Sequence, residues 1–341
     1  MSTIADVAKR AGVSKMTVSR VINNSGYISQ DTRSRVEEAI AELGYIPNAL
    51  ARSLRFKQTQ TIALIVTDIT NPFFTTIARG VEDTASELGF SVIFCNTDES
   101  PEEEQEYIRV LMQKQIDGLL LVPARSRPDS VALLQDKTIP LVLLDRQLPG
   151  QSIDSVRCDS ELGAYRLVRH LLDLGHRRIA MLSGPADVTT AADRVAGWQR
   201  ALREAGLDAP AGLLEYGTYS VESGYAMARR ALEASPRPTA FFTANNFIAV
   251  GAVRALVERG LRVPEDVSFV TFDDLPPTMV IDPFFTSAMQ PAYEMGRQAT
   301  LLLLDRLEGK GPDGPQETIL PPEFVFRRSS GPPPGTRPAE D

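Results

Sequence analysis

Cysteine and histidine are scarce in this 341-residue sequence, with two of each. Cys95 and Cys158 form no CxxC pair and have no histidine nearby, so both are predicted to be buried thiols. His170 and His176 stand beside no serine or cysteine nucleophile motif, and the sequence contains no GxGxxG motif or P-loop. These absences predict a protein that is not an enzyme and that uses no cofactor or metal.

Long apolar runs are also missing. The longest, such as 119–122 and 139–144, fall far short of the roughly 20 residues needed to cross a bilayer. The N-terminus has no basic segment followed by an apolar one, so we expect no export signal and a cytoplasmic location. Residues 331–341, GPPPGTRPAED, have little to bury and are predicted to form a disordered tail.

The formal net charge of -8 is unevenly distributed along the chain. Residues 1–60 contain nine Lys and Arg against five Asp and Glu, a net charge of +4, so the other 281 residues carry -12. A small basic head on an acidic body indicates that only the head meets a polyanion.

Residues 1–46 have the periodicity of three short helices. Thr3 and Asp6 have the spacing of a capping box, and an apolar stripe at Ile4, Val7, Ala8 and Ala11 follows. Ser14 can cap a second helix, and a third is expected over 31–43, ended by Gly44. The sequence therefore predicts a small all-α head.

The first two predicted helices have the form of a helix-turn-helix, in which the second helix enters the major groove. On a helical wheel Lys15, Met16 and Arg20 lie on the exposed arc. Arg20 can bind guanine, Lys15 can reach guanine or phosphate, and Met16 can touch a thymine methyl. A generic three-helix bundle with a solvated polar face is the alternative.

Three further side chains of the head are better placed for the DNA backbone, namely Thr17, Asn23 and Tyr45. The segments 3–14, 17–23 and 43–48, which read TIADVAKRAGVS, TVSRVIN and LGYIPN, closely resemble the DNA-binding head of the lactose/galactose repressor family. In that family the positions that match Lys15, Met16 and Arg20 select the operator half-site. The resemblance therefore implies that these three residues read bases.

Residues 47–59 are predicted to be a hinge. The helix formers at 48–55 span barely two turns, too few for a stable isolated helix, so this helix would form only against DNA or a partner helix. Leu54, between Arg52 and Arg55, fits a minor-groove wedge, although it could equally pack on the body as an ordinary linker residue. The resemblance implies the wedge, with two hinges paired across a dimer on a palindromic, bent operator.

Residues 60–330 alternate short apolar strands with amphipathic helices. Strands are predicted at 61–67, 90–95, 118–122, 140–144, 178–182, 239–243 and 267–272. Helices are predicted at 74–88, 102–114, 160–174, 192–205, 222–234, 247–259 and 291–308. This order predicts an α/β core with parallel sheets, and its length suggests two lobes with a cleft between them.

This core resembles the two-lobed sugar-binding core that the family shares with periplasmic binding proteins. In such lobes ligands lie beyond the carboxyl ends of the strands. Phe73 and Phe74 follow the first predicted strand and can form an aromatic face, while Asp145 follows the fourth. Loop aromatics also serve as core plugs, and the acidic side chain could simply cap a helix.

The resemblance implies the remaining effector contacts. Arg194, Asn245 and Asp273 match the polar ligands of the family, and Thr190 and Tyr219 match positions that line its pocket. A helix cap is again the alternative for Asp273. Together with the aromatic face and Asp145, this set suits a sugar or a sugar acid.

Two residues depart from patterns found in the family. Asn246 stands where relatives commonly have aspartate, which leaves the identity of the effector open. Val188 stands where purine-responsive relatives have arginine, which favours a ligand other than a purine.

The sequence thus predicts a sequence-specific DNA-binding transcriptional regulator. We expect a repressor of carbohydrate catabolism or uptake genes that a sugar or sugar acid releases from a palindromic operator. A corepressed or activating regulator of the same fold stays open, whereas a sugar-binding receptor would have no use for residues 1–60. A C-terminal helix with leucine heptads, which makes some relatives tetrameric, is missing, so a homodimer is expected.

Overall fold

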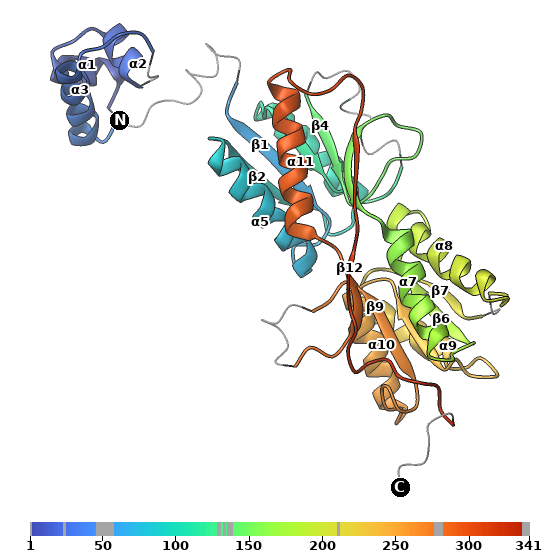
Figure 1. The fold of residues 1–341 in the computed structure, drawn as a ribbon. Helices are drawn as coiled ribbons and strands as arrows, with labels where there is room; N and C mark the ends of the chain where they lie inside the picture. Colours follow the sequence, from blue (N-terminus) through green and yellow to red (C-terminus); the bar gives the residue numbers. More distant parts are fainter. Residues whose placement is uncertain are drawn as a thin grey trace. The chain divides into compact units, whose positions relative to one another are not determined.

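The computed structural model describes residues 2–22, 25–45, 58–127, 131, 134, 139–209, 212–275 and 282–335. The chain divides into two compact units, Met1–Thr59 and Gln60–Asp341 (Figure 1). Among the described residues, no helix is long and apolar enough to cross a membrane.

The first unit is a bundle of three helices, α1 (Ile4–Ala11), α2 (Lys15–Ile22) and α3 (Gln30–Leu43). A capping box starts α1, because the Thr3 amide donates to Asp6 Oδ2 at 2.8 Å and the Asp6 amide donates to Thr3 Oγ1 at 3.4 Å. Apolar side chains of all three helices form one small core, made of Val7, Ala8, Ala11, Val18, Val21, Val36 and Ala39. The predicted all-α head is confirmed.

The second unit contains two six-stranded sheets. The sheet of lobe 1 has the order β11-β5-β4-β3-β1-β2 and is parallel throughout. Its strands are β1 (Thr61–Val66), β2 (Ser91–Asn96), β3 (Gly118–Leu121), β4 (Leu141–Leu144), β5 (Asp154–Cys158) and β11 (Glu317–Leu320).

The sheet of lobe 2 has the order β12-β10-β9-β8-β6-β7. Its strands are β6 (Ile179–Ser183), β7 (Leu214–Tyr216), β8 (Ala240–Thr243), β9 (Ser268–Phe272), β10 (Thr286–Met289) and β12 (Glu323–Val325). The predicted α/β core with two lobes is confirmed, and one antiparallel pair, β10 with β12, departs from the expected parallel pairing.

Helices cover the sheets in closely packed pairs. Lobe 1 has α5 (Pro72–Glu87) and α11 (Ala292–Leu307) side by side, as Figure 1 shows, and α6 (Pro101–Gln113) packs against the core of the opposite face. The α5–α11 contact requires glycine, because a Cβ atom on Gly80 would lie 2.2 Å from the Tyr293 carbonyl oxygen. Lobe 2 has the pairs α7 (Ser160–Asp173) with α8 (Thr189–Glu204), and α9 (Val221–Ala231) with α10 (Asn246–Glu258).

The chain passes between the lobes three times, after β5, after β10 and after β11. After the third passage it runs along lobe 2 to Gly331, which is buried. The Gly331 carbonyl accepts hydrogen bonds from His176 Nε2 at 2.8 Å and from Ser268 Oγ at 2.7 Å, and its amide donates to Ser268 Oγ at 2.9 Å. The prediction of a disordered tail is therefore wrong for Gly331. Its backbone can be buried because both its amide and its carbonyl form hydrogen bonds.

Candidate functional site

The helix-turn-helix face of the head lies on α2. Ser14 caps this helix, since its Oγ accepts from the Thr17 amide at 3.0 Å. Val18 and Val21 are buried in the head core, while Lys15, Met16 and Arg20 are exposed, Met16 by 59%. The structure thus places the three predicted base-reading residues together on the outer face of α2.

Three arginines elsewhere in the described head, Arg10, Arg33 and Arg35, are paired with acids. Arg10 lies 2.6 Å from Glu42, and Arg35 lies 3.4 Å from Asp31. Within the described part of the head, Lys15 and Arg20 form no ion pair, so their charges are available to a polyanion. The exposed face of α2 therefore carries two positive charges that form no ion pair within the described head.

The other predicted DNA contacts are only partly described. Thr17 and Tyr45 are half-buried, and Tyr45 packs against the head core. Asn23 and the hinge residues Arg52, Leu54 and Arg55 lie outside the described residues. Tyr27, in the link between α2 and α3, is 95% exposed.

All eight predicted effector residues meet in one cavity between the two lobes. They are Phe73, Phe74, Asp145, Thr190, Arg194, Tyr219, Asn245 and Asp273. The cavity is completed by five residues that sequence reasoning did not select, namely Asp68, Asn71, Glu99, Arg146 and Gln290. Most of these side chains follow the carboxyl ends of parallel strands, which meet at one edge of each sheet.

Sharp turns bring the acidic side chains into the cavity. Asp145 directly follows β4 and Asp273 directly follows β9, and both have left-handed backbones, with φ of 63° and 59°. Aspartate tolerates this conformation better than most residues. Neither residue is the N-cap of a helix in the described chain, so the alternative hypothesis that these two aspartates are helix caps is wrong.

Asn245 is the residue of this set that does cap a helix. Its Oδ1 accepts from the Ile248 amide at 2.9 Å and starts α10. The cap fixes the side chain, which also lines the cavity. Capping and ligand binding are therefore compatible at this position.

Arg146 is held by lobe 1 itself. Its guanidinium donates to both carboxylate oxygens of Glu99, at 2.6 and 2.8 Å, and to the carbonyls of Pro123 and Ala124, each at 3.0 Å. Burial would raise the pKa of Glu99, but the charge and hydrogen bonds of Arg146 hold it below its ordinary value. Arg146 and Glu99 thus form a two-pronged ion pair in the wall of the cavity, and Arg125 also donates to Glu99 at 3.1 Å.

Arg194 comes from the first turns of α8 in lobe 2. Its Nη1 donates to the Ala244 carbonyl at 2.6 Å, and its guanidinium carbon lies over the Phe272 ring, 3.9 Å from the ring centre. Burial raises the pKa of Asp145, and burial raises the pKa of Asp273 to about 6, although the charge of Arg194 opposes both shifts. The charge of Arg194 therefore acts on two buried carboxyls, and Arg146 lies 3.9 Å from one of them, Asp145.

Four buried polar atoms of the cavity have no hydrogen-bond partner among the described residues. They are Asp145 Oδ1, Gln290 Oε1, Arg146 Nε and Arg194 Nε. Gln290 itself is oriented by its Nε2, which donates to Asp273 Oδ2 at 3.1 Å. The cavity thus presents two hydrogen-bond acceptors and two donors, each of which is costly to leave unpaired.

Aromatic rings complete two sides of the cavity. Phe73 and Phe74 pack edge to face in the first turn of α5, with ring centres 4.9 Å apart. Tyr219 faces Thr190, its hydroxyl 3.3 Å from Thr190 Oγ1, and its ring lies below the guanidinium of Arg146 in lobe 1. These faces can stack on the apolar sides of a ring-shaped ligand.

The lobes touch directly around this cavity. The Ser126 amide of lobe 1 donates to the Asp187 carbonyl of lobe 2 at 3.2 Å, and the Thr189 amide donates to Ser126 Oγ at 2.9 Å. Arg127 pairs with Asp187 at 2.9 Å. The structure is therefore a closed arrangement of the two lobes.

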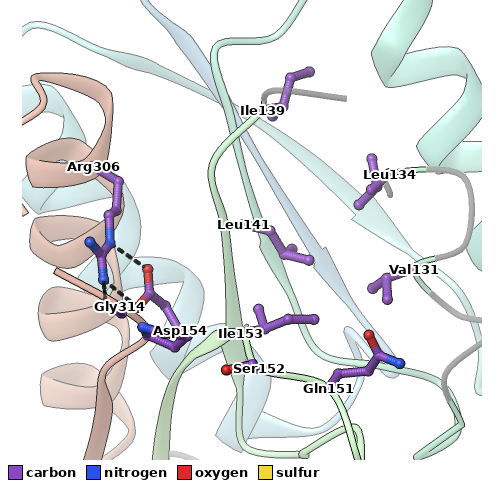
Figure 2. Close-up of a pocket in the computed structure, with 11 residues that line it drawn as sticks. Val131, Leu134, Ile139, Leu141, Gln151, Ser152, Ile153, Asp154, Arg306 and Gly314 are labelled. Atoms are coloured by element: carbon purple, nitrogen blue, oxygen red, sulfur yellow. Dashed lines mark hydrogen bonds and ion pairs between the residues drawn. The ribbon is translucent and has the colours of Figure 1, made fainter. Parts of the chain in front are cut away.

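A second cavity lies at the amino ends of β4 and β5 in lobe 1 (Figure 2). Apolar side chains such as Ile139, Leu141 and Ile153 line one side. Its charged residues are already paired, because Arg306 Nε and Nη2 donate to the two oxygens of Asp154 at 2.7 and 2.8 Å. None of the predicted effector residues reaches this cavity, whose ion pair ties α11 to β5.

The comparisons with known proteins match both parts of the chain. Residues 3–48 match the family described as "Bacterial regulatory proteins, lacI family". Residues 59–328 match "Periplasmic binding proteins and sugar binding domain of LacI family".

Similar proteins span nearly the whole chain. The transcriptional repressor PurR of Haemophilus influenzae is 39% identical over 334 residues, which are 96% of this chain and 98% of the relative. The ribose operon repressor of Escherichia coli is 38% identical over 308 residues, 90% of this chain and 93% of the relative. The Lac repressor dimer bound to operator and the anti-inducer ONPF superposes with a TM-score of 0.86 at 31% identity, covering 97% of this chain and 99% of that one. On these matches the chain belongs to the LacI family of bacterial regulatory proteins.

Proposed function

We propose that this DNA-binding regulator represses carbohydrate catabolism or uptake genes and is released from a palindromic operator by a sugar bound between its lobes. The DNA is read by Lys15, Met16 and Arg20 on α2, with two heads of a homodimer on two half-sites. The cytoplasm, where the operator lies, is the corresponding location.

The unpaired polar atoms in the cavity carry the proposal for the effector. Asp145 Oδ1 and Gln290 Oε1 need donors, and Arg146 Nε and Arg194 Nε need acceptors. A hydroxyl group can donate and accept at once, so a ring with several hydroxyls can satisfy all four. The aromatic faces of Phe73 and Tyr219 suit the apolar faces of the same ring.

Charge distinguishes a neutral sugar from a sugar acid. Four acids line the cavity, Asp68, Glu99, Asp145 and Asp273, against two arginines. Arg146 donates to Glu99 and lies 3.9 Å from Asp145, while the charge of Arg194 acts on both Asp145 and Asp273, so two arginines are shared among three of these acids. A ligand carboxylate would add a negative charge to this site, and we therefore favour a neutral sugar over a sugar acid.

The names of the relatives do not select the effector by themselves. The match to PurR, at 39% identity, is as strong as the match to the ribose operon repressor, at 38%. Val188, at the start of α8, is apolar and buried, which supports a ligand other than a purine. Corepression is the second candidate, because the same cavity could stabilise the DNA-bound form.

The effector proposal is tested by thermal unfolding of the full chain with matched ligand pairs. D-glucose is compared with D-glucuronate and D-galactose with D-galacturonate, and D-ribose and cellobiose are added. A ligand that binds only the folded protein raises its Tm by mass action. We expect at least one neutral sugar to raise the Tm and its acid partner not to.

Two variants locate the binding. Asp145→Asn, which removes an acceptor from the cavity, should abolish the rise in Tm. The control Asp173→Asn changes the same group at the exposed end of α7 and should keep it. Stabilisation by the uronates alone would overturn the neutral-sugar proposal.

A further inference from the structure

Two asparagine side chains join the lobes beside the effector cavity. Asn71 is the N-cap of α5 in lobe 1, and Asn246 is the first residue of α10 in lobe 2. Asn71 Nδ2 donates to Asn246 Oδ1 and Asn246 Nδ2 donates to Asn71 Oδ1, each at 3.2 Å. Both side chains are buried, with exposed fractions of 5% and 0%.

The orientation of each amide is fixed from its own lobe. Asn71 Oδ1 accepts from the Phe73 amide at 3.1 Å, so a rotated amide would lose the cap of α5. Asn246 Nδ2 also donates to the Asp274 carbonyl at 3.3 Å, and a rotated amide would set its oxygen against that carbonyl. Position 246 therefore needs one group that donates and one that accepts, which asparagine has and aspartate lacks at neutral pH.

Asp274 connects this pair to the effector cavity. It directly follows Asp273, whose carboxyl lines the cavity. The Asp274 carboxylate accepts from Arg327 Nη1 at 2.6 Å and from the Leu275 amide at 2.8 Å. The loop that carries Asp273 is thus tied to lobe 2 by Arg327 and to lobe 1 through Asn246.

We propose that Asn246 is a positioning residue that couples closure of the two lobes to the placement of the loop bearing Asp273. It stabilises the closed arrangement by two buried hydrogen bonds to Asn71. In that arrangement its hydrogen bond to the Asp274 carbonyl also positions the adjacent residue, Asp273. The role in effector binding rests on the proposed function, whereas the coupling itself belongs to the protein without ligand.

Hydrogen exchange in the ligand-free full chain tests the coupling. Three backbone amides, called the rim amides below, form hydrogen bonds across the lobes. They are those of Ser126, to the Asp187 carbonyl, Gln147, to Thr189 Oγ1, and Thr189, to Ser126 Oγ. They belong to segments of the chain other than those of the Asn71–Asn246 pair, so their exchange reports opening of the lobes and not a local change. Exchange from a minor open state rises in proportion to the population of that state.

The variant Asn246→Asp keeps an acceptor and loses the donor. Aspartate is favourable in the first turn of a helix, so α10 and the fold should be retained. We expect exchange of the three rim amides to rise about tenfold, the effect of losing one buried hydrogen bond between the lobes, from Asn246 Nδ2 to Asn71 Oδ1. The Leu275 amide should also exchange faster, and the amides of the central strand β1 should be unchanged.

A second variant and a control complete the test. Asn71→Asp keeps the cap of α5 but removes the donor that lobe 1 contributes to the asparagine pair. It should therefore raise exchange at the same rim amides. Gln113→Glu adds the same charge at an exposed position of α6 and should change nothing. Unchanged rim exchange in both aspartate variants would overturn the proposal. An equal rise in β1 would also overturn it, since Asn246 would then stabilise only the fold. Neither result depends on which sugar binds.

Discussion

The guanidinium of Arg194 lies 3.9 Å from the centre of the Phe272 ring, at the end of the strand that positions Asp273. This stacking holds the charge in the lobe 2 wall, between Asp145 and Asp273, with Nε left unpaired. The flat, forked guanidinium is suited to stacking and to several hydrogen bonds at once.

Arg194→Lys should therefore abolish the response to effector while the charge is kept. Lysine has one compact ammonium group that cannot stack in the same way or reach the same acceptors. We expect sugar affinity to fall by at least about tenfold, with DNA affinity near normal, as measured by calorimetry and by fluorescence anisotropy of a labelled duplex. Normal release of DNA by the sugar would contradict the assigned role of Arg194.

Arg20→Ala should relax the DNA sequence preference. Arg20 is exposed on α2 and, among the described residues of the head, forms no ion pair. Loss of a base contact should cost about 1–3 kcal/mol per half-site on a duplex obtained by in vitro selection, and much less on a scrambled duplex. Arg35→Ala, which removes a charge paired with Asp31, is the control. Equal weakening on both duplexes would show that Arg20 does not read bases.

His176 should make the stability of lobe 2 depend on pH. Because the Gly331 carbonyl can only accept, His176 Nε2 carries the proton and Nδ1 accepts from Thr239 Oγ1 at 2.9 Å. Burial lowers the pKa of His176, although the bond to Gly331 raises it. The neutral ring therefore contributes stability that is present above about pH 6.5 and is lost as the pH falls through its lowered pKa.

Urea unfolding at pH 7.5 and 5.5 measures this contribution. His176→Gln should lower the free energy of unfolding by about 1–3 kcal/mol at pH 7.5 and should show a smaller loss between the two pH values than the unmodified chain. His170→Gln is the control for the other histidine, which contacts Ser330 and the Phe326 ring. An identical pH dependence in the unmodified chain and His176→Gln would refute the assignment.

Asp273 should make the free energy of unfolding depend on pH in the opposite direction to His176. Burial raises its pKa from 3.8 to about 6, so the folded protein binds a proton more tightly than the unfolded chain does. The free energy of unfolding should therefore fall as the pH rises from about 4 to 6, by at most about 3 kcal/mol. Asp273→Asn should remove that part of the slope, and sugar affinity of the unmodified chain should weaken below pH 6 as the acceptor is protonated.

The sequence predicted most of the helices and the central strands because their apolar residues follow a regular period. It did not predict β5, β7, β10, β11 or β12. In β5, Asp154 and Arg157 interrupt the apolar pattern because Arg306 and Glu317, far along the chain, pair with them. In β10, Thr286 is buried because the C-terminal segment satisfies it, its amide donating to Ser329 Oγ at 2.7 Å. Partners so distant along the chain cannot be predicted from a local sequence pattern.

The same reason explains which cavity residues were not predicted. Gln290 follows β10, a strand that the sequence did not reveal, so nothing marked it as the end of a strand. Glu99 and Asn71 acquire their roles from Arg146 and Asn246, which the fold brings to them from distant segments. Residues that follow the predicted central strands, such as Asp145 and Asp273, could be selected from sequence.

The central claim is that a sugar bound between the lobes and DNA bound by the heads oppose each other. Binding of either ligand must change the affinity of the other by the same factor, because the two equilibria are linked. The direct measurement is calorimetric titration of the full chain with the stabilising neutral sugar, with and without the selected palindromic duplex. We predict weaker sugar binding in the presence of the duplex. Equal affinities would contradict release by the sugar, and tighter binding would make the sugar a corepressor.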